Sequence, residues 1–240
     1  MRARAAVAAA APLATAVALH AAPALTARDP LRRLWPRLSG CGAADGVALT
    51  FDDGPDPEGT PAVLAALADL GWTATFFLLG SQTRRHPDVA RAVAAAGHEI
   101  AVHGDDHRNH LFHGPRWIDR DLARATATVT EVTGVRPRLF RPPYGVLSGG
   151  SLRTTARLGL TPVLWTAWGR DWLPSTPERV VDHLRADLRR GGTLLLHDSD
   201  CTSTPGSWRA TAAALPILAA ELDHRALPVR PLREHLVSTV

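Results

Sequence analysis

Short apolar segments alternate with amphipathic segments along most of the chain, and this alternation restricts the possible folds more than any other feature. The apolar segments predict strands at residues 46–51, 73–79, 98–103, 138–141, 160–165, 193–197 and 226–229. The amphipathic segments predict helices at residues 61–70, 87–96, 117–133, 151–158, 177–190 and 207–222. Strands that alternate with helices form right-handed βα units and a parallel sheet.

The predicted strands are almost continuously apolar, which fits a sheet buried on both faces. About seven βα units favour a barrel, although an open doubly wound sheet has the same local pattern. The loop Gly54-Pro55-Asp56-Pro57 after the first strand matches neither dinucleotide nor P-loop spacing. With 240 residues, the chain has room for one large α/β domain or two small ones.

The charge of the chain does not indicate a nucleic-acid partner. The formal net charge is +4, and Arg2, Arg4 and Arg28 against Asp29 contribute half of it. The remaining excess is too small for the basic surface that nucleic-acid binding requires.

Residues 1–27 combine a basic start with an apolar stretch and small-residue cleavage sites, which is typical of a secretory signal peptide or an N-terminal anchor. A disordered alanine-rich leader is the alternative. The stretch is short and contains Pro12, so it does not predict a membrane span. We expect a leader or anchor at residues 1–27, a linker or lead-in at 28–45 and the folded domain at 46–240. The expected location is secreted or cell-envelope associated, with membrane contact only through a possible N-terminal anchor.

The two cysteines, Cys41 and Cys201, favour one disulfide in an exported chain, although their spacing alone does not prove the pairing. Residues 38–41 also resemble a lipoprotein cleavage box. The arginines just before this box do not belong between an apolar stretch and its cleavage site, which argues against lipidation.

Polar side chains follow several predicted strands at the point where each strand ends. They are Asp52, Asp53, His103, Arg141, Asp171, His197 and Asp198. Because the carboxyl ends of parallel strands face one rim, we expect these side chains to converge there.

His103 and His107 are spaced i, i+4 and, with one carboxylate from Asp52 or Asp53, form a set typical of catalytic zinc sites. Such a set leaves a coordination position open for water. Several other readings remain open at this point. The histidines could lie on the surface beside a turn, residues 103–113 could be an adventitious histidine-rich metal tract, and Asp-Asp-Gly-Pro is also ordinary turn chemistry.

The other polar segments have a structural and a functional interpretation each. Residues 141–145 could be a rigid loop, or a wall whose backbone N–H faces an oxyanion. Residues 171–172 could lead into a helix with a buried indole, and residues 194–197 could be a core strand with a capping histidine.

Taken together and in this order, these segments resemble the polysaccharide deacetylases of carbohydrate esterase family 4, the NodB homology domain. Residues 50–55 (TFDDGP) match the first motif of that family fully. The later motifs correspond to residues 103–107 (HGDDH), 141–145 (RPPYG), 171–172 (DW) and 195–197 (LLH). The resemblance spans roughly residues 46–230, and five ordered motifs make it specific.

The resemblance implies a distorted (β/α)7 barrel in a single domain and a metal-dependent hydrolase that removes acetyl groups. It implies Asp53, His103 and His107 as metal ligands, Asp52 as general base, His197 as general acid, Arg141 as the residue that orients Asp52, and Asp171 as the partner of His197. It also implies four substrate-binding residues, Pro143, Tyr144, Trp172 and Leu195. The backbone N–H of Tyr144 would face the oxyanion, and Trp172 and Leu195 would form an apolar slot for the acetyl methyl. The implied cofactor is a divalent metal, zinc first, with cobalt or another divalent ion as alternatives.

Two residues depart from the family pattern. Gly104 replaces the usual Ser or Thr of the second motif, which removes a hydroxyl that would brace the metal loop. Trp168 stands where many members carry an earlier acid before Asp171. The first departure could lower the rigidity of the loop at residues 103–107. The second could change the chemistry of the substrate groove near Asp171.

The expected substrate is an N-acetylated amino sugar in a polysaccharide or oligosaccharide, of the peptidoglycan or chitin type, with acetate as product. An esterase that removes O-acetyl groups from acetylated xylan or a similar glycan is the alternative, followed by a non-catalytic glycan-binding relative. We expect a monomer without a nucleic-acid partner.

Overall fold

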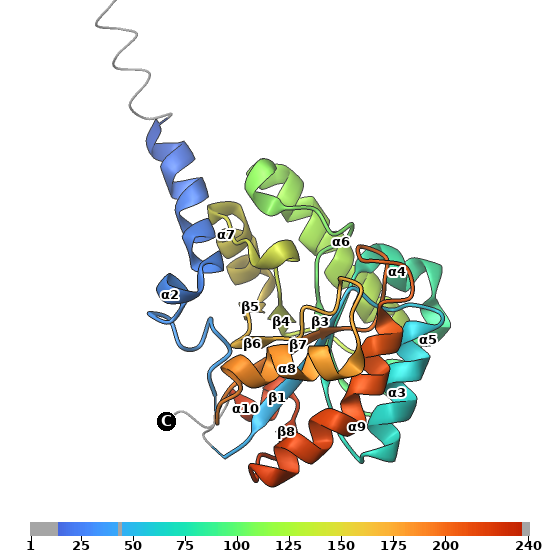
Figure 1. The fold of residues 1–240 in the computed structure, drawn as a ribbon. Coiled ribbons are helices and arrows are strands. Elements are labelled where there is room, and N and C mark those ends of the chain that lie inside the picture. Colours follow the sequence, from blue (N-terminus) through green and yellow to red (C-terminus); the bar gives the residue numbers. More distant parts are fainter. Residues whose placement is uncertain (1–13, 43–44, 237–240) are drawn as a thin grey trace, which may run out of the picture.

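A curled parallel sheet occupies the centre of the molecule, and helices surround it (Figure 1). The computed structural model describes residues 14–42 and 45–236. The strands are β1 (Val47–Asp52), β2 (Thr75–Leu78), β3 (Glu99–Val102), β4 (Leu139–Phe140), β5 (Thr161–Pro162), β6 (Ala167–Trp168), β7 (Thr193–His197) and β8 (Val229–Arg230). Seven of them run in the order β5-β4-β3-β2-β1-β7-β6, and β8 pairs in parallel with the start of β1. The predicted distorted (β/α)7 barrel is confirmed.

The helices pack in a row around the sheet, in the order of the strands that they follow. Neighbouring contacts run from α8 (Pro177–Asp187) to α9 (Trp208–His224), α3 (Gly59–Asp69), α5 (Pro87–Ala95), α6 (Pro115–Thr133) and α7 (Gly149–Leu158). The shorter elements are η1 (Ala22–Ala27), α2 (Asp29–Arg32), α4 (Gly80–Arg85), η2 (His110–Phe112), η3 (Pro143–Gly145) and α10 (Leu232–His235). All the predicted helices are present, and α4 was not predicted.

The core lies between the sheet and this row of helices. Every residue of β1 is buried, and the ring of Phe51 stacks on that of Phe76 at a centroid distance of 5.0 Å. Because β1 is covered on both faces, its side chains before Asp52 are apolar except for Thr50, whose hydroxyl donates to the carbonyl of Leu194 at 2.7 Å. The first charged side chain of the strand, Asp52, therefore appears at the carboxyl rim.

The predicted strand at residues 160–165 is wrong in extent, because the structure divides this region into two short strands, β5 and β6. Between them, the N–H of Leu164 donates to the carbonyl of Leu38 at 2.7 Å. The hydroxyl of Thr193 donates to the carbonyl of Gly40 at 2.6 Å. The lead-in is therefore packed along the gap between β5 and β6 and does not form a free linker.

The expected disulfide is also absent, because both cysteines are free. The N–H of Gly42, next to Cys41, donates to Gly191, just before β7 begins. Cys201 follows the other end of β7 and lies near Asp53. The length of a five-residue strand, about 16 Å, separates these positions, which is beyond the reach of a disulfide.

The leader prediction is only partly covered by the structure, because residues 1–13 lie outside the described residues. Residues 14–21 are helical, and His20 contacts the carbonyl of Leu111. Within the described residues, no helix is long and apolar enough to cross a membrane. Residues 43–44 and 237–240, which belong to the predicted lead-in and domain, also lie outside the described part.

Candidate metal and catalytic site

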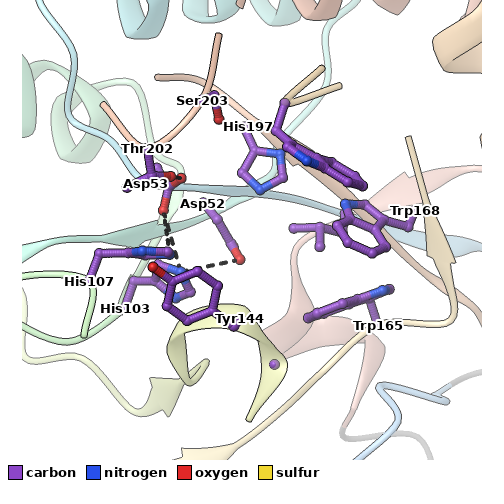
Figure 2. Close-up of a pocket in the computed structure, with 13 residues that line it drawn as sticks. Asp52, Asp53, His103, His107, Tyr144, Trp165, Trp168, His197, Thr202 and Ser203 are labelled. Atoms are coloured by element: carbon purple, nitrogen blue, oxygen red, sulfur yellow. Dashed lines mark hydrogen bonds and ion pairs between the residues drawn. The ribbon is translucent and has the colours of Figure 1, made fainter. Parts of the chain in front are cut away.

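The register of the sheet brings the motif residues to one rim. Asp52 at the end of β1 is the direct parallel partner of His197 at the end of β7. His103 follows β3, and Arg141 follows β4. The expected convergence is therefore observed: Asp52, Asp53, His103, His107 and His197 all line one cavity of about 320 Å³ (Figure 2).

Asp53, His103 and His107 form a compact group whose side-chain atoms could hold a metal ion. The Oδ1 atom of Asp53 lies 3.4 Å from Nε2 of His103 and 3.3 Å from Nε2 of His107. Within the described residues these three are a group whose ligand atoms all lie within 4.8 Å of one another. Figure 2 shows the three side chains pointing into the same space.

Burial and charge favour the protonation states that a metal site needs. Burial lowers the pKa of His107 to about 4 despite the opposing attraction of Asp53, so that its imidazole is neutral. Burial opposes ionisation of Asp53, but the neighbouring histidines outweigh it and hold the pKa of Asp53 below its usual value. Nδ1 of His103 bonds to the carbonyl of Arg141 at 2.8 Å, which directs Nε2 toward Asp53.

A divalent cation fits this group on the evidence of the donor atoms themselves. Oδ1 of Asp53 is buried and has no hydrogen-bond partner, although it faces two imidazole nitrogens. An ionised carboxylate oxygen left in this way is expensive unless a cation satisfies it. Two imidazoles and one carboxylate, with an open position, are the donor set of catalytic zinc sites.

The loop that carries the two histidines is braced despite the glycine at position 104. Gly104 has a φ of +91°, and a Cβ there would lie 3.2 Å from Oδ2 of Asp121. That oxygen accepts a hydrogen bond from the N–H of Asp105 at 3.1 Å. The buried carboxylate of Asp105 binds both guanidinium nitrogens of Arg84, at 2.8 and 2.9 Å, and pairs with Arg124. These charged contacts hold the loop of residues 103–107 in place without the hydroxyl that Ser or Thr would supply at position 104.

The other two histidines of the tract are engaged elsewhere. His110 is fully buried and bonds to the hydroxyl of Ser151 at 3.0 Å. The ring of His113 lies 3.9 Å from that of Trp117. Neither belongs to the group formed by Asp53, His103 and His107.

Arg141 holds the Asp52 side chain through only one of its two carboxylate oxygens. The guanidinium of Arg141 donates to Oδ1 of Asp52 at 2.7 Å and to the hydroxyl of Thr50 at 2.8 Å. Arg141 is fully buried, and its remaining donors reach the carbonyls of Val163 and Leu164. Burial lowers the pKa of Arg141, while the attraction of Asp52 opposes that shift. The second oxygen of Asp52 lies 3.8 Å from Nε2 of His103.

His197 is paired with Asp171 through its other ring nitrogen. Nδ1 of His197 lies 2.8 Å from Oδ1 of Asp171, and the backbone N–H of His197 donates to Oδ2 at the same distance. The hydroxyl of Thr211 also donates to Oδ2, at 2.7 Å. Burial disfavours the imidazolium, but the attraction of Asp171, followed by Asp53 and Asp52, raises the pKa of His197 to about 9. The imidazole is therefore protonated at neutral pH and faces the cavity with Nε2.

Aromatic and apolar side chains form the opposite wall of the cavity. The indoles of Trp168 and Trp172 stack at a centroid distance of 4.2 Å, and Trp165 lies 5.5 Å from Trp168. Leu195 precedes His197 by two residues on β7, so both side chains face the same side of the strand. Tyr144 is the second residue of η3, has a φ of 60° and is 61% exposed.

Most of the residues that line this cavity were predicted from the sequence, but some were not. Pro143 is buried and does not line the cavity, and Arg141 and Asp171 lie behind Asp52 and His197. Trp165, Thr202 and Ser203 line the cavity and were not anticipated. Trp165 ends an apolar run, which is also ordinary for a core residue, and the loop at residues 202–203 carries no motif.

A second cavity of about 460 Å³ adjoins the first and shares His107, Tyr144 and Thr202 with it. Its other residues include Arg108 and Phe112, the latter 79% exposed. The hollow thus continues past the metal-ligating group along the surface of η2.

Comparisons with known proteins agree with this geometry. A family model described as polysaccharide deacetylase matches residues 39–163. The chain is 37% identical over 213 residues to a chitooligosaccharide deacetylase of Sinorhizobium fredii, covering 86% of this chain and 98% of that protein. It is 34% identical over 180 residues to a peptidoglycan-N-acetylglucosamine deacetylase of Bacillus cereus, covering 73% of this chain and 81% of that protein.

The fold is similar to a crystal structure of a peptidoglycan N-acetylglucosamine deacetylase in complex with an N-hydroxybenzamide compound. The TM-score is 0.77 and the sequence identity 25%, over 82% of this chain and 92% of that one.

Proposed function

The chain belongs to the polysaccharide deacetylase family, and from this premise we propose that it hydrolyses the acetamido group of N-acetylated amino sugars in a glycan, releasing acetate. The relatives that support this proposal are named as deacetylases of chitooligosaccharides and of peptidoglycan. The proposed substrate class is therefore an oligomer or polymer that contains N-acetylglucosamine.

One observation carries the proposal: an acid and a base lie at one rim beside a metal-ligating group. Asp52 and His197 are direct partners across β1 and β7, and both line the cavity that contains Asp53, His103 and His107. Amide hydrolysis needs a base for the attacking water and an acid for the departing nitrogen, and this cavity offers both.

A divalent cation held by Asp53, His103 and His107 would lower the pKa of water and polarise the acetyl carbonyl. Asp52 accepts the proton of the attacking water through the oxygen that Arg141 leaves free. His197 then donates its Nε2 proton to the leaving nitrogen, and Asp171 stabilises the imidazolium before that transfer. The products are acetate and a free amino sugar.

The walls of the cavity fit the rest of the acetamido group. Leu195 and Trp172 offer an apolar surface to the acetyl methyl. The N–H of Tyr144 belongs to the first turn of η3, where backbone donors have no partner within the helix. It is the proposed donor to the oxyanion of the tetrahedral intermediate, and such a donor typically contributes about 3 kcal/mol.

The adjoining cavity supports an oligomeric substrate rather than a single sugar. It continues from His107 and Tyr144 toward the exposed ring of Phe112 and the guanidinium of Arg108. An aromatic face and polar groups at its side suit a pyranose ring, whose C–H face is apolar and whose hydroxyls form hydrogen bonds.

Zinc is the proposed ion, with cobalt or another divalent ion as the alternative, because two histidines and one carboxylate are a common zinc donor set. Export through the predicted leader at residues 1–27 is part of the same proposal, since it would bring the protein to extracellular glycans.

A substrate panel read by acetate release tests the function. We expect release from chitin oligomers or peptidoglycan, and loss of release when a chelator removes the metal. Asp52→Asn is expected to lower the rate about 10²- to 10⁴-fold, the usual contribution of a general base, while metal uptake persists.

His103→Ala is the contrasting variant, because it is expected to lose metal and activity together. Release from acetylxylan alone would instead identify an O-acetyl esterase. Near-native activity of Asp52→Asn would show that the base is wrongly assigned.

A further inference from the structure

The loop between β7 and α9 contacts the carboxylate of Asp53, which faces the two histidines of the proposed metal site. This loop belongs to none of the family motifs. This loop, residues 198–207, begins directly after His197. Thr202 lies on it and lines both cavities. Figure 2 shows Thr202 directly beside Asp53.

The two oxygens of Asp53 have different surroundings. Oδ2 accepts a hydrogen bond from the hydroxyl of Thr202 at 2.5 Å. Oδ1 has no hydrogen-bond partner and faces Nε2 of His103 and of His107. The carboxylate is only 1% exposed, so water does not compete for either oxygen.

We propose that Thr202 is a positioning residue for Asp53: its hydroxyl holds Oδ2, so that Oδ1 alone is presented to a divalent cation. The inference rests on the proposed metal site. Partners that bond to the far side of a metal ligand fix its orientation, and their loss typically weakens metal affinity 10- to 100-fold.

One bound oxygen, rather than two, matters for the chemistry of the site. Three protein donors would leave a position on a divalent ion for water or substrate, and a carboxylate that bound through both oxygens would occupy more of the coordination sphere. By engaging Oδ2, Thr202 would keep that position open when a cation is bound.

Several hydrogen bonds of the loop do not involve the hydroxyl of Thr202. The N–H of Thr204 donates to the carbonyl of Trp172 at 3.0 Å, and the N–H of Ser203 donates to that of Asp200 at 3.0 Å. The N–H of Gly206 also donates to Oδ2 of Asp200. Replacing the hydroxyl by a methyl group therefore removes a bond to Asp53 while these bonds remain.

The test measures zinc affinity of the full chain by competition with a chromophoric chelator, after removal of bound metal. Thr202→Val keeps the shape of the side chain and removes the donor, and we expect a 10- to 100-fold larger Kd for zinc. Thr202→Ser restores the donor and is expected to return the Kd close to that of the unchanged protein.

Thr204→Val is the matched control, because it makes the same substitution in the same loop at a residue that lines neither cavity. Its Kd is expected to be unchanged. The thermal unfolding midpoint of each metal-free variant provides the second readout, and for Thr202→Val it is expected to match that of the unchanged protein.

An unchanged zinc Kd in Thr202→Val would overturn the inference. So would a lowered metal-free midpoint in Thr202→Val that accompanies a weaker Kd without rescue in Thr202→Ser, since that pattern indicates a general structural role. If the unchanged protein binds zinc but releases no acetate from any glycan, the proposed function fails while the zinc measurements on Thr202 still decide this inference.

Discussion

The protonation state of His197 depends on two opposing effects at one side chain. Burial disfavours the charged imidazole, whereas the carboxylate of Asp171, 2.8 Å from Nδ1, favours it. The carboxylate dominates, and the pKa rises from 6.5 to about 9. A general acid must carry its proton, so this residue is competent below that pH and loses competence as the pH rises through it.

The pH–rate profile should therefore lose activity on its alkaline side, and Asp171→Asn should move that loss to lower pH. The amide keeps the shape of the side chain and removes the charge that raises the pKa of His197. Initial rates of acetate release between pH 5 and 10 measure the shift.

The exposed carboxylate of Asp69, at the end of α3, provides the control for this experiment. Asp69→Asn is expected to leave the profile in place. An alkaline limb that stays in the same position in Asp171→Asn would show that His197 is not the acid whose titration limits the reaction.

For single residues, the sequence predicted those members of the site that belong to a family motif. Asp52, Asp53 and His197 each end or follow an apolar strand, so both their position and their convergence were predictable. Thr202 was not predictable, because a threonine in a polar loop is common and its contact with Asp53 spans 149 residues of sequence.

The loop of residues 103–107 links the two histidines of the proposed metal site, and its backbone conformation depends on residues particular to this chain. Gly104 has a φ of +91°, a conformation that residues with a Cβ rarely adopt. Its nearest neighbour, Asp121, receives the N–H of Asp105 and occupies the space beside it. Glycine at position 104 and aspartate at position 121 are therefore matched to each other.

Restoring the serine of the related motif at position 104 should consequently destabilise this chain. Gly104→Ser would place a Cβ in a strained backbone and 3.2 Å from Oδ2 of Asp121. Strain of this kind costs about 1–3 kcal/mol. Denaturant unfolding of the metal-free protein should show a loss of that size in the free energy of unfolding.

Gly114→Ser is the comparison, because Gly114 has a φ of −69° and a Cβ there would meet nothing within 4 Å. Serine is also favourable at this N-cap of α6, so stability should stay the same or rise. Equal stability of Gly104→Ser and the unchanged protein would mean that the loop tolerates the side chain and that the proposed match with Asp121 is wrong.

The elements themselves followed the sequence pattern closely, with an instructive exception. β1 and β7 were predicted because their apolar runs are buried by elements on both faces. The break between β5 and β6 was not, because Leu164 bonds to Leu38 across 126 residues instead of continuing a strand. Local apolar patterning carries no information about such a distant partner.

At the scale of the whole molecule, the lead-in segment before β1 packs against the sheet. Leu38 packs against the cluster of Leu164, Trp165 and Leu195, which backs the wall of the active-site cavity. The guanidinium of Arg32 lies 5.3 Å from the ring centre of Trp165. The lead-in is thus part of the structure that supports the cavity wall containing Trp165 and Leu195.

Two truncations separate the predicted leader from this supporting segment. A chain that begins at residue 28 loses residues 1–27, including the contact of His20 with Leu111, and is expected to unfold cooperatively and to release acetate as the full chain does. A chain that begins at residue 45 also loses Leu38 and Gly40, the partners of Leu164 and Thr193.

The shorter chain removes the acceptors of the N–H of Leu164 and the hydroxyl of Thr193, and it uncovers the cluster of Leu164, Trp165 and Leu195 against which Leu38 packs. Each lost hydrogen bond costs about 0.5–1.5 kcal/mol, and the apolar surface that becomes exposed costs about 25 cal/mol per Å². Because a domain of this kind has only about 5–15 kcal/mol of stability, we expect loss of cooperative unfolding and of acetate release. Circular dichroism during thermal unfolding and an acetate assay distinguish the two chains. Full activity of the chain that begins at residue 45 would show that the sheet is stable without the lead-in.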